Sequence, residues 1–226
     1  MRIEKYSNDR LRARKARILK TARQIIGAKG VDGLTMRELA EKSDVALATL
    51  YNIFGSKDVL VGYAVNDFLE GILDLSVQKA PKKASLEKLL LVLDLIARDV
   101  KKSSAYIHVV VALYFKIERD KGVHNMLYNI GHSKFAELLE SMRDEANYYD
   151  WVSLDLLADE FTEQVLWRIL QWGRKAIPDS LLADSMKYSV LQILVGATRG
   201  AMTDQINAHL KTTTSKLARL HPRTGR

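Results

Sequence analysis

Apolar residues recur at helical spacing along most of this chain, and few residues interrupt the pattern. Only three prolines are present, Pro81, Pro178 and Pro222. No alternating run of β-branched residues is long enough to predict a sheet. We therefore predict an all-α fold. Of the 226 residues, 47% are hydrophobic, which is enough for at least one well-packed core.

The ends of the predicted helices carry recognisable signals. Gly30 can take a positive φ after the last turn of a first helix. Thr35 and Glu38 have the spacing of a capping box, in which each residue satisfies an amide of the other. Ser56 is an expected N-cap, and Pro81 marks a linker. The predicted helices cover residues 11–29, 36–43, 46–54, 57–78, 85–102, 104–117, 122–146, 153–175 and 179–210.

Positive charge is concentrated at the two ends of the chain. Residues 1–60 hold 13 Lys and Arg against 7 Asp and Glu, whereas residues 61–210 hold 17 against 20. Residues 211–226 hold five Lys and Arg and no acidic residue. A basic terminal module suits a nucleic-acid binder, because cations near phosphates release condensed counterions. Basic termini can equally be solubilising tails.

Two short predicted helices joined by a tight turn at Asp44 form a helix-turn-helix, with small Ala40 where the pair must approach closely. The stretch GVDGLTMRELAEKSDVALATLYNIFGSKDVLV resembles the DNA-binding signature of the TetR family of transcriptional regulators, over about residues 12–62. The resemblance implies a three-helix DNA-binding domain over residues 1–62. A long helix would join it to a helical effector-binding and dimerisation domain over residues 63–226.

The resemblance also assigns roles in DNA binding. Residues 46–54 are similar to the recognition helix of the family, so Leu47, Ala48 and Asn52 are expected in the major groove. The expected phosphate contacts are Thr35, Thr49, Tyr51 and Lys57. Without the resemblance, Tyr51 could be a partly buried core aromatic and Lys57 an ordinary solvated lysine. Leu39, Ala40, Val45, Leu50 and Phe54 have the spacing of core residues.

Three departures from the family pattern stand out. Asp44 replaces the usual turn glycine, but Asp tolerates a left-handed conformation better than most residues. Residues 46–48 are Ala-Leu-Ala where many relatives have Ser-Lys-Gly, and Ile53 replaces a frequent polar or aromatic residue. Base contacts should therefore be more apolar, with Leu47 and Ala48 against thymine methyl groups and Asn52 on an adenine edge.

A basic arm precedes the first predicted helix. It contains Arg10, Arg12, Arg14, Lys15 and Arg17. Such an arm can enter a minor groove, or it can be a flexible tail that adds only non-specific affinity.

The C-terminal body resembles the family in layout alone. The resemblance implies a homodimer in which the helices over 153–175 and 179–210 pair with those of a second subunit. Gly196 and Gly200, four residues apart, would let these helices approach closely. A core helix of a monomer is the alternative. The candidates for an effector pocket, each also explicable as packing, are Tyr106, His108, Tyr114, His132, Trp167 and Trp172.

Catalytic and metal-binding functions receive no support from the sequence. Cysteine is absent, no histidine pair has metal-ligand spacing, and no phosphate loop or nucleophile elbow appears. Asp155, Asp159, Glu160 and Glu163 are expected on a solvated helix face. No apolar run is long enough to span a membrane and no signal peptide is apparent, so we expect a cytoplasmic protein without a cofactor.

The sequence thus favours a repressor that a small hydrophobic or aromatic effector releases from a palindromic operator. Two alternatives remain at this point. One is a similar DNA-binding protein without a small-molecule effector, controlled by a protein partner or organising the chromosome. The other is a small helical enzyme.

Overall fold

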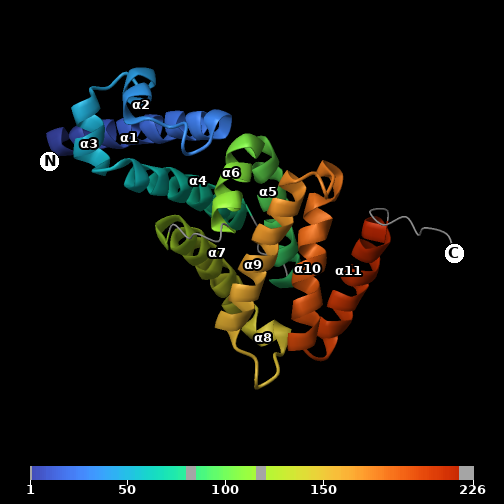
Figure 1. Ribbon diagram of the computed structural model, residues 1–226. Coiled ribbons are helices and arrows are strands. Elements are labelled where there is room, and N and C mark those ends of the chain that lie inside the picture. The colour runs from blue at the N-terminus through green and yellow to red at the C-terminus, as the bar shows by residue number, and fades with distance from the viewer. Residues whose placement is uncertain (1, 80–84, 116–120, 219–226) are drawn as a thin grey trace. The chain divides into compact units, whose positions relative to one another are not determined.

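The computed structural model describes residues 2–79, 85–115 and 121–218 (Figure 1). Within these ranges the structure is helical and contains no strand, which confirms the predicted all-α class; one isolated bridge joins Tyr148 and Thr198. No described helix is both long and apolar enough to cross a membrane. The elements are α1 (Arg2–Lys29), α2 (Met36–Lys42), α3 (Leu47–Phe54), α4 (Lys57–Lys79), α5 (Ser85–Lys102), α6 (Ser104–Tyr114), α7 (Lys121–Ser141), α8 (Arg143–Ala146), α9 (Leu154–Gly173), the 3₁₀ turn η1 (Asp179–Leu181), α10 (Leu182–Ala197) and α11 (Ala201–Leu217).

The chain divides into two compact units. The first contains the described residues of 1–69 and 104–126, and the second those of 70–103 and 127–226. The chain therefore leaves the first unit along α4 and returns to it with α6. The linker predicted at Pro81 lies outside the described residues.

The first unit is built around the apolar side of α1. Five of its side chains are at most 3% exposed, namely Ile18, Leu19, Ala22, Ile25 and Ile26. Helices α2 and α6 pack against α1, and α2 packs against α3. A Cβ on Gly27 would lie 3.2 Å from the backbone nitrogen of Tyr106, so α1 and α6 approach closely at this glycine.

Helix α1 begins at Arg2, well before the predicted start near residue 11. The basic residues 10–17 are thus part of the helix, and the prediction of an arm preceding it is wrong. Because these residues continue a helix that is already packed from Ile18 onward, each added turn escapes the cost of nucleation. Arg, Lys, Leu and Ala, which dominate the segment, are also strong helix formers.

In the second unit, α10 is the central helix and packs against α9, α11 and α5 (Figure 1). Buried apolar side chains run along it, including Met186, Val190 and Leu194 at 0% exposure. Polar contacts at the edges of α10 fix its orientation against α5 and α9. Lys187 pairs with Asp94 of α5 at 2.6 Å, and Arg168 Nε of α9 donates to Ser189 Oγ at 2.6 Å.

The single helix predicted over 179–210 is wrong, because the chain turns between α10 and α11. Thr198 is extended and Gly200 has a φ of 66°. The amide of Tyr149 donates to the carbonyl of Ala197 at 3.1 Å, so a distant loop satisfies backbone groups at the break. Because apolar residues recur at helical spacing on both sides of the turn, the sequence pattern alone predicted one continuous helix. Gly200 belongs to the turn and not to a helix face.

The helix predicted over 122–146 is also divided. Helix α7 ends at Ser141, and α8 follows as one short turn that ends before Asn147, whose φ is 48°. The predicted helices over 57–78, 85–102 and 153–175 are confirmed as α4, α5 and α9, with bounds that shift by at most two residues.

Candidate nucleic-acid interface

Helices α2 and α3 form a helix-turn-helix in the first unit. The turn between them contains Asp44 with a φ of 51°, and the amide of Val45 donates to the carbonyl of Ala40 at 3.1 Å. The prediction that Asp44 supports a left-handed turn is confirmed. This hydrogen bond holds the start of α3 against α2.

Helix α3 has one buried side and one exposed side. Leu50 is fully buried and Phe54 is 3% exposed, as their spacing predicts. On the opposite side Leu47 is 37% exposed and Tyr51 49% exposed. Ala48 and Asn52 are exposed on this side too. Four of the predicted DNA-contacting residues thus share one free helix face, and Tyr51 is not a core aromatic.

Thr35 is the N-cap of α2. Its hydroxyl oxygen accepts a hydrogen bond from the amide of Glu38 at 3.2 Å. Thr35 is exposed, and an exposed helix start with a hydroxyl and unpaired amides suits an anion.

The reciprocal half of the predicted capping box is absent. The Glu38 carboxylate instead accepts from Lys29 at 2.8 Å and pairs with Lys42 at 2.9 Å. These two ammonium groups lower the pKa of Glu38. Lys29 and Lys42 therefore share one carboxylate, which offsets one of their two positive charges.

Lys57 lies at the start of α4, just after the end of α3. Gly55 has a φ of 75° and lets the chain turn after α3, and Ser56 Oγ accepts from the amide of Val59 at 3.3 Å. The Lys57 ammonium donates to the carbonyl of Asp32 at 3.5 Å. This long contact orients the half-buried Lys57 without neutralising it. Thr49 is half-buried on α3.

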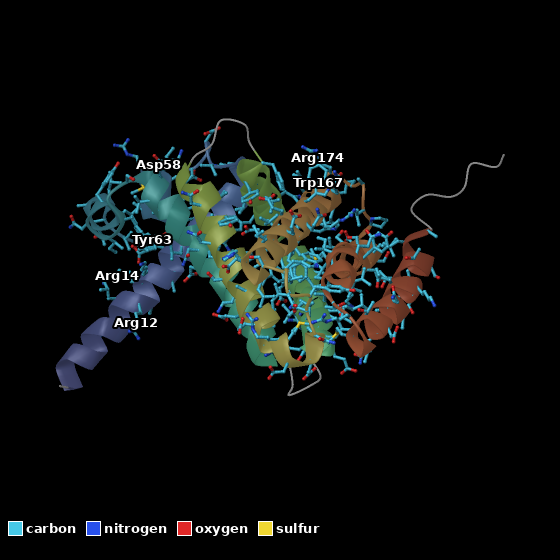
Figure 2. All side chains as sticks on the ribbon, turned by 90° about the horizontal axis from the view of Figure 1, so that it is seen from below. Arg12, Arg14, Asp58, Tyr63, Trp167 and Arg174 are labelled. Carbon is cyan, nitrogen blue, oxygen red and sulfur yellow. The ribbon has the colours of Figure 1, made fainter. Side chains whose placement is uncertain are left out.

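Sequence reasoning missed one cation of this unit, Arg37, and gave no specific contact for Lys15 of the basic arm. Arg37 is exposed in the first turn of α2, two residues after Thr35, and its place in that turn was the available signal. Lys15 lies with its ammonium 3.8 Å from the centroid of the Tyr63 ring and 6.0 Å from that of Phe54. Figure 2 shows Tyr63 beside α1, with Arg14 and Arg12 farther along the helix toward its N-terminus.

The predicted effector residues are divided between the two units. Tyr106, His108 and Tyr114 lie on α6 in the first unit, whereas His132 on α7, Trp167 and Trp172 on α9 belong to the second.

On α6, Tyr106 and Tyr114 are buried, and His108 is half-buried. Tyr106 stacks edge-on against Phe68 with the ring centroids 5.3 Å apart, and its buried hydroxyl has no hydrogen-bond partner among the described residues. Burial raises the pKa of Tyr106, so this phenol stays protonated and can donate.

In the second unit, Trp172 has a structural role, since its indole nitrogen donates to Asp179 at 2.7 Å. His132 stacks on Tyr128 and has its Nε2 3.5 Å from an Asp159 oxygen, to which the Tyr128 hydroxyl also donates. Two acidic residues expected on a solvated face, Asp155 and Asp159, thus lie beside His132. Trp167 is 38% exposed on α9 (Figure 2).

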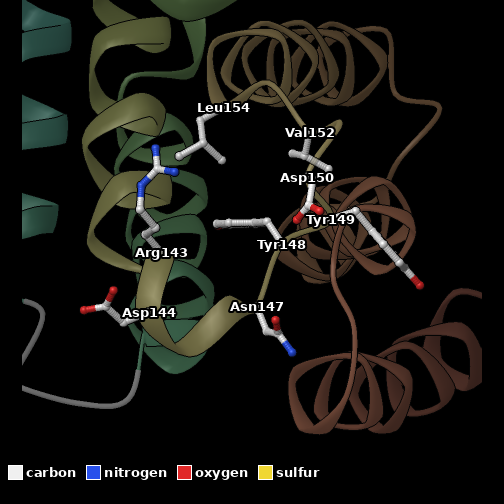
Figure 3. Close-up of a pocket in the computed structure, with 8 residues that line it drawn as sticks. All are labelled: Arg143, Asp144, Asn147, Tyr148, Tyr149, Asp150, Val152 and Leu154. Carbon is white, nitrogen blue, oxygen red and sulfur yellow. The ribbon is translucent and has the colours of Figure 1, made fainter.

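A surface cavity of about 320 Å³ lies in the second unit, around the loop between α8 and α9 (Figure 3). None of the predicted effector residues lines it. Its walls carry charged groups, in contrast to the apolar pocket expected for an effector. The lining residues are Arg143, Asp144, Asn147, Tyr148, Tyr149, Asp150, Val152 and Leu154. The described residues contain no group of three or more His, Asp or Glu side chains arranged for a metal ion.

Comparisons with known proteins agree with this geometry. A family model described as "Bacterial regulatory proteins, tetR family" matches residues 18–64. The HTH-type transcriptional repressor KstR of Rhodococcus jostii (strain RHA1) is 32% identical over 96 residues, which is 42% of this chain and 45% of that repressor. The matched segment thus spans less than half of the length of this curated relative.

Solved structures resemble the chain over most of its length. A TetR-family regulator from Syntrophomonas wolfei has a TM-score of 0.70 at 15% identity, covering 82% of this chain and 96% of that one. FadR of Thermus thermophilus, a TetR-family repressor solved in complex with lauroyl-CoA, has a TM-score of 0.66 at 17% identity, covering 83% and 97%. At these identities the likeness is one of fold. Residues 18–64 thus match the DNA-binding segment of bacterial regulatory proteins of the TetR family, and the chain has the fold of solved TetR-family regulators.

Proposed function

We propose that this protein is a transcriptional regulator that binds a palindromic operator as a homodimer and is released from it by a small hydrophobic effector. The observation that carries the proposal is the free face of α3, where Leu47, Ala48, Tyr51 and Asn52 are exposed while Leu50 and Phe54 anchor the opposite side. The curated relative that matches 42% of this chain is a transcriptional repressor, which supports the direction of the effect.

Base recognition is assigned to the first two turns of α3. Leu47 and Ala48 carry no hydrogen-bonding side-chain group, so they suit the methyl group of thymine. Asn52 can bond the N6 and N7 edge of an adenine in a bidentate manner. The surrounding positions supply the phosphate contacts that fix the register of the protein on DNA, without reading sequence. These are Thr35, Arg37, Thr49, Tyr51 and Lys57.

Dimerisation is assigned to the outer faces of α9 and α10. Leu156 is 65% exposed and Trp167 38% exposed, and their spacing of eleven residues puts them on one side of α9. On α10, Gly196 is exposed and has no atom within 4 Å of the place of a Cβ, so a second helix can approach there. Two subunits would present their recognition helices to half-sites about 34 Å apart.

Effector control is assigned to the helices that follow the DNA-binding domain. The buried Tyr106 hydroxyl has no hydrogen-bond partner among the described residues and could donate to a bound ligand. Among the relatives in fold, one was solved with lauroyl-CoA and another is described as a gamma-butyrolactone receptor. An effector that binds the DNA-free conformation more tightly shifts the equilibrium by its difference in affinity for the two conformations.

The test begins with the selection of duplexes from a random-sequence pool by the full-length protein. We expect enrichment of a palindrome, and binding that weakens steeply with salt. Failure to enrich any sequence would contradict the proposed function. Lauroyl-CoA and a panel of apolar carboxylic acids and lactones are then titrated against the complex with the selected duplex. If the complex is fully retained with every compound of the panel, the proposal of effector control is contradicted. The alternative, a DNA-binding protein without a small-molecule effector, is then favoured.

A further inference from the structure

The N-terminal extension of α1 carries an unusual density of free positive charge. Within the described residues, Arg10, Arg12, Arg14 and Arg17 are all exposed and none forms an ion pair. Three other cations of the same unit are already engaged. Arg23 pairs with Asp67 at 2.8 Å, and Lys29 and Lys42 share the Glu38 carboxylate.

Three of the four arginines share one side of the helix. Arg10, Arg14 and Arg17 are separated by four and three residues, which puts them in one row along α1. At 1.5 Å per residue the row is about 10 Å long. Phosphates of one DNA strand advance by about 3.4 Å along the duplex axis, so the row has the length of about three phosphate steps.

Lys15 fixes this segment beside the recognition helix. Its ammonium lies over the Tyr63 ring at 3.8 Å, and Tyr63 in turn packs edge-on against Phe54 at the end of α3, with the ring centroids 5.8 Å apart. The extension is therefore held in the same packed unit as α3, next to the C-terminal end of that helix.

The helical conformation restricts how the extension can bind. An α-helix with its side chains is about 10–12 Å across, whereas the minor groove of B-DNA is about 6 Å wide. The extension therefore cannot enter the minor groove as a strand-like arm would. We propose that Arg10, Arg14 and Arg17 form a phosphate-binding row that lies along the DNA backbone outside the groove read by α3, and that adds affinity without sequence information. This inference rests on the proposed DNA-binding function.

The test compares the full-length protein with the triple variant Arg10→Gln/Arg14→Gln/Arg17→Gln. The probes are a duplex selected by the unmodified protein and a duplex of the same composition in shuffled order. Each neutralised phosphate contributes about 0.9 to the slope of log K against log salt, so the removal of three arginine charges per subunit lowers the slope by about 2.7. Raising the salt from 50 to 200 mM weakens the binding of both proteins. The loss of affinity should be smaller for the variant than for the unmodified protein, by a factor of about 40 per subunit. The reduction in affinity at low salt should be the same on both duplexes.

Two controls separate charge from folding. The variant Arg174→Gln/Lys211→Gln removes exposed cations from the second unit and should leave the salt slope unchanged. The triple Arg-to-Lys variant keeps the charges and should retain most of the affinity, because a lysine still neutralises a phosphate.

Three outcomes would overturn the inference. The first is an unchanged slope in the triple Gln variant. The second is a reduction in affinity restricted to duplexes with A·T-rich flanks, because that pattern means minor-groove reading by an unwound arm. The third is a reduction on the selected duplex alone, which means base recognition. If the unmodified protein selects no duplex, the proposed function fails together with the inference, whereas normal selection with an unchanged slope removes the inference only.

Discussion

At the residue scale, the recognition helix is unusual because its exposed face combines apolar residues with a single amide. Leu47 and Ala48 offer only apolar contact, so in the proposed function directional base recognition on α3 depends on Asn52. A bidentate contact of this kind contributes about 1–3 kcal/mol of discrimination against the wrong base.

We therefore expect Asn52→Ala to relax the preference at one base pair of each half-site by about ten- to one-hundred-fold. Competition binding with all single-base variants of the selected duplex measures this. Asn207→Ala, at an exposed position of α11, is the matched control and should not alter the preference. The assignment is wrong if Asn52→Ala weakens binding equally to every duplex variant.

At the scale of elements, α7 and α9 approach closely at a glycine. A Cβ on Gly131 would lie 2.6 Å from Cγ2 of Thr162, a side chain that is 2% exposed. Overpacking of such a contact costs about 1–3 kcal/mol. We expect Gly131→Ala to lower the free energy of unfolding by this amount in urea titrations.

Two variants make this prediction sharper. Thr162→Ser removes Cγ2, so the double variant Gly131→Ala/Thr162→Ser should be more stable than Gly131→Ala alone. Gly71→Ala, on α4, meets no atom within 4 Å and should leave stability unchanged or raise it by up to about 1 kcal/mol through helix propensity. Equal stability of Gly131→Ala and Gly71→Ala would contradict the close approach.

Helix α5 ends in a charged cluster that makes stability depend on pH. Asp99 accepts two hydrogen bonds from Arg98 at 2.9 Å each and one from Lys102 at 3.0 Å. The hydrogen bonds from Arg98, followed by that from Lys102, lower the pKa of Asp99 from 3.8 to about 2.

Because the pKa in the folded state lies below that of the unfolded chain, the contribution of Asp99 to stability is present above pH 3.8 and is lost as the pH falls through about 2. Asp99→Asn should therefore lower the melting temperature at pH 6 and reduce its further decline between pH 4 and pH 2. Thermal unfolding followed by circular dichroism measures both effects. Asp204→Asn, an exposed acid of α11, serves as the control, and identical pH profiles for the two variants would refute the assignment.

At the scale of the whole molecule, DNA binding and dimerisation are expected to be linked, since one recognition helix alone reads only half of a palindrome. A charge placed on the outer face of α9 should separate the subunits, because it would be buried there without a partner. We expect Leu156→Glu and Trp167→Glu to shift the sedimentation profile from dimer to monomer and to weaken operator binding.

Leu11→Glu changes a leucine that is 53% exposed in the first unit and should leave the dimer intact. Persistence of the dimer in both α9 variants would place the seam on another surface. Loss of the dimer with undiminished DNA affinity would contradict the proposed linkage between dimerisation and DNA binding.

Local signals in the sequence were sufficient for most of the helices and for the helix-turn-helix. The period of apolar residues, the cap at Thr35 and the turn at Asp44 act within a few residues, so they can be read without knowledge of the rest of the chain. The two faces of α3 follow in the same way, since Leu50 and Phe54 repeat at one helical turn and Tyr51 and Asn52 lie between them on the exposed side.

Tertiary structure decided what depends on distant partners. Glu38 has the right place for a capping box, yet Lys29 and Lys42 offer its carboxylate stronger, charge-assisted bonds. The sequence pattern placed Gly200 on a helix face. In the structure Gly200 lies in a turn, which is stabilised by hydrogen bonds with the distant loop around Asn147 and Tyr149. The arginines of α1 are helical because the packed part of α1 nucleates them. Local patterns thus determined which residues form helices, whereas competition among non-local partners decided where the helices end and which charges remain free.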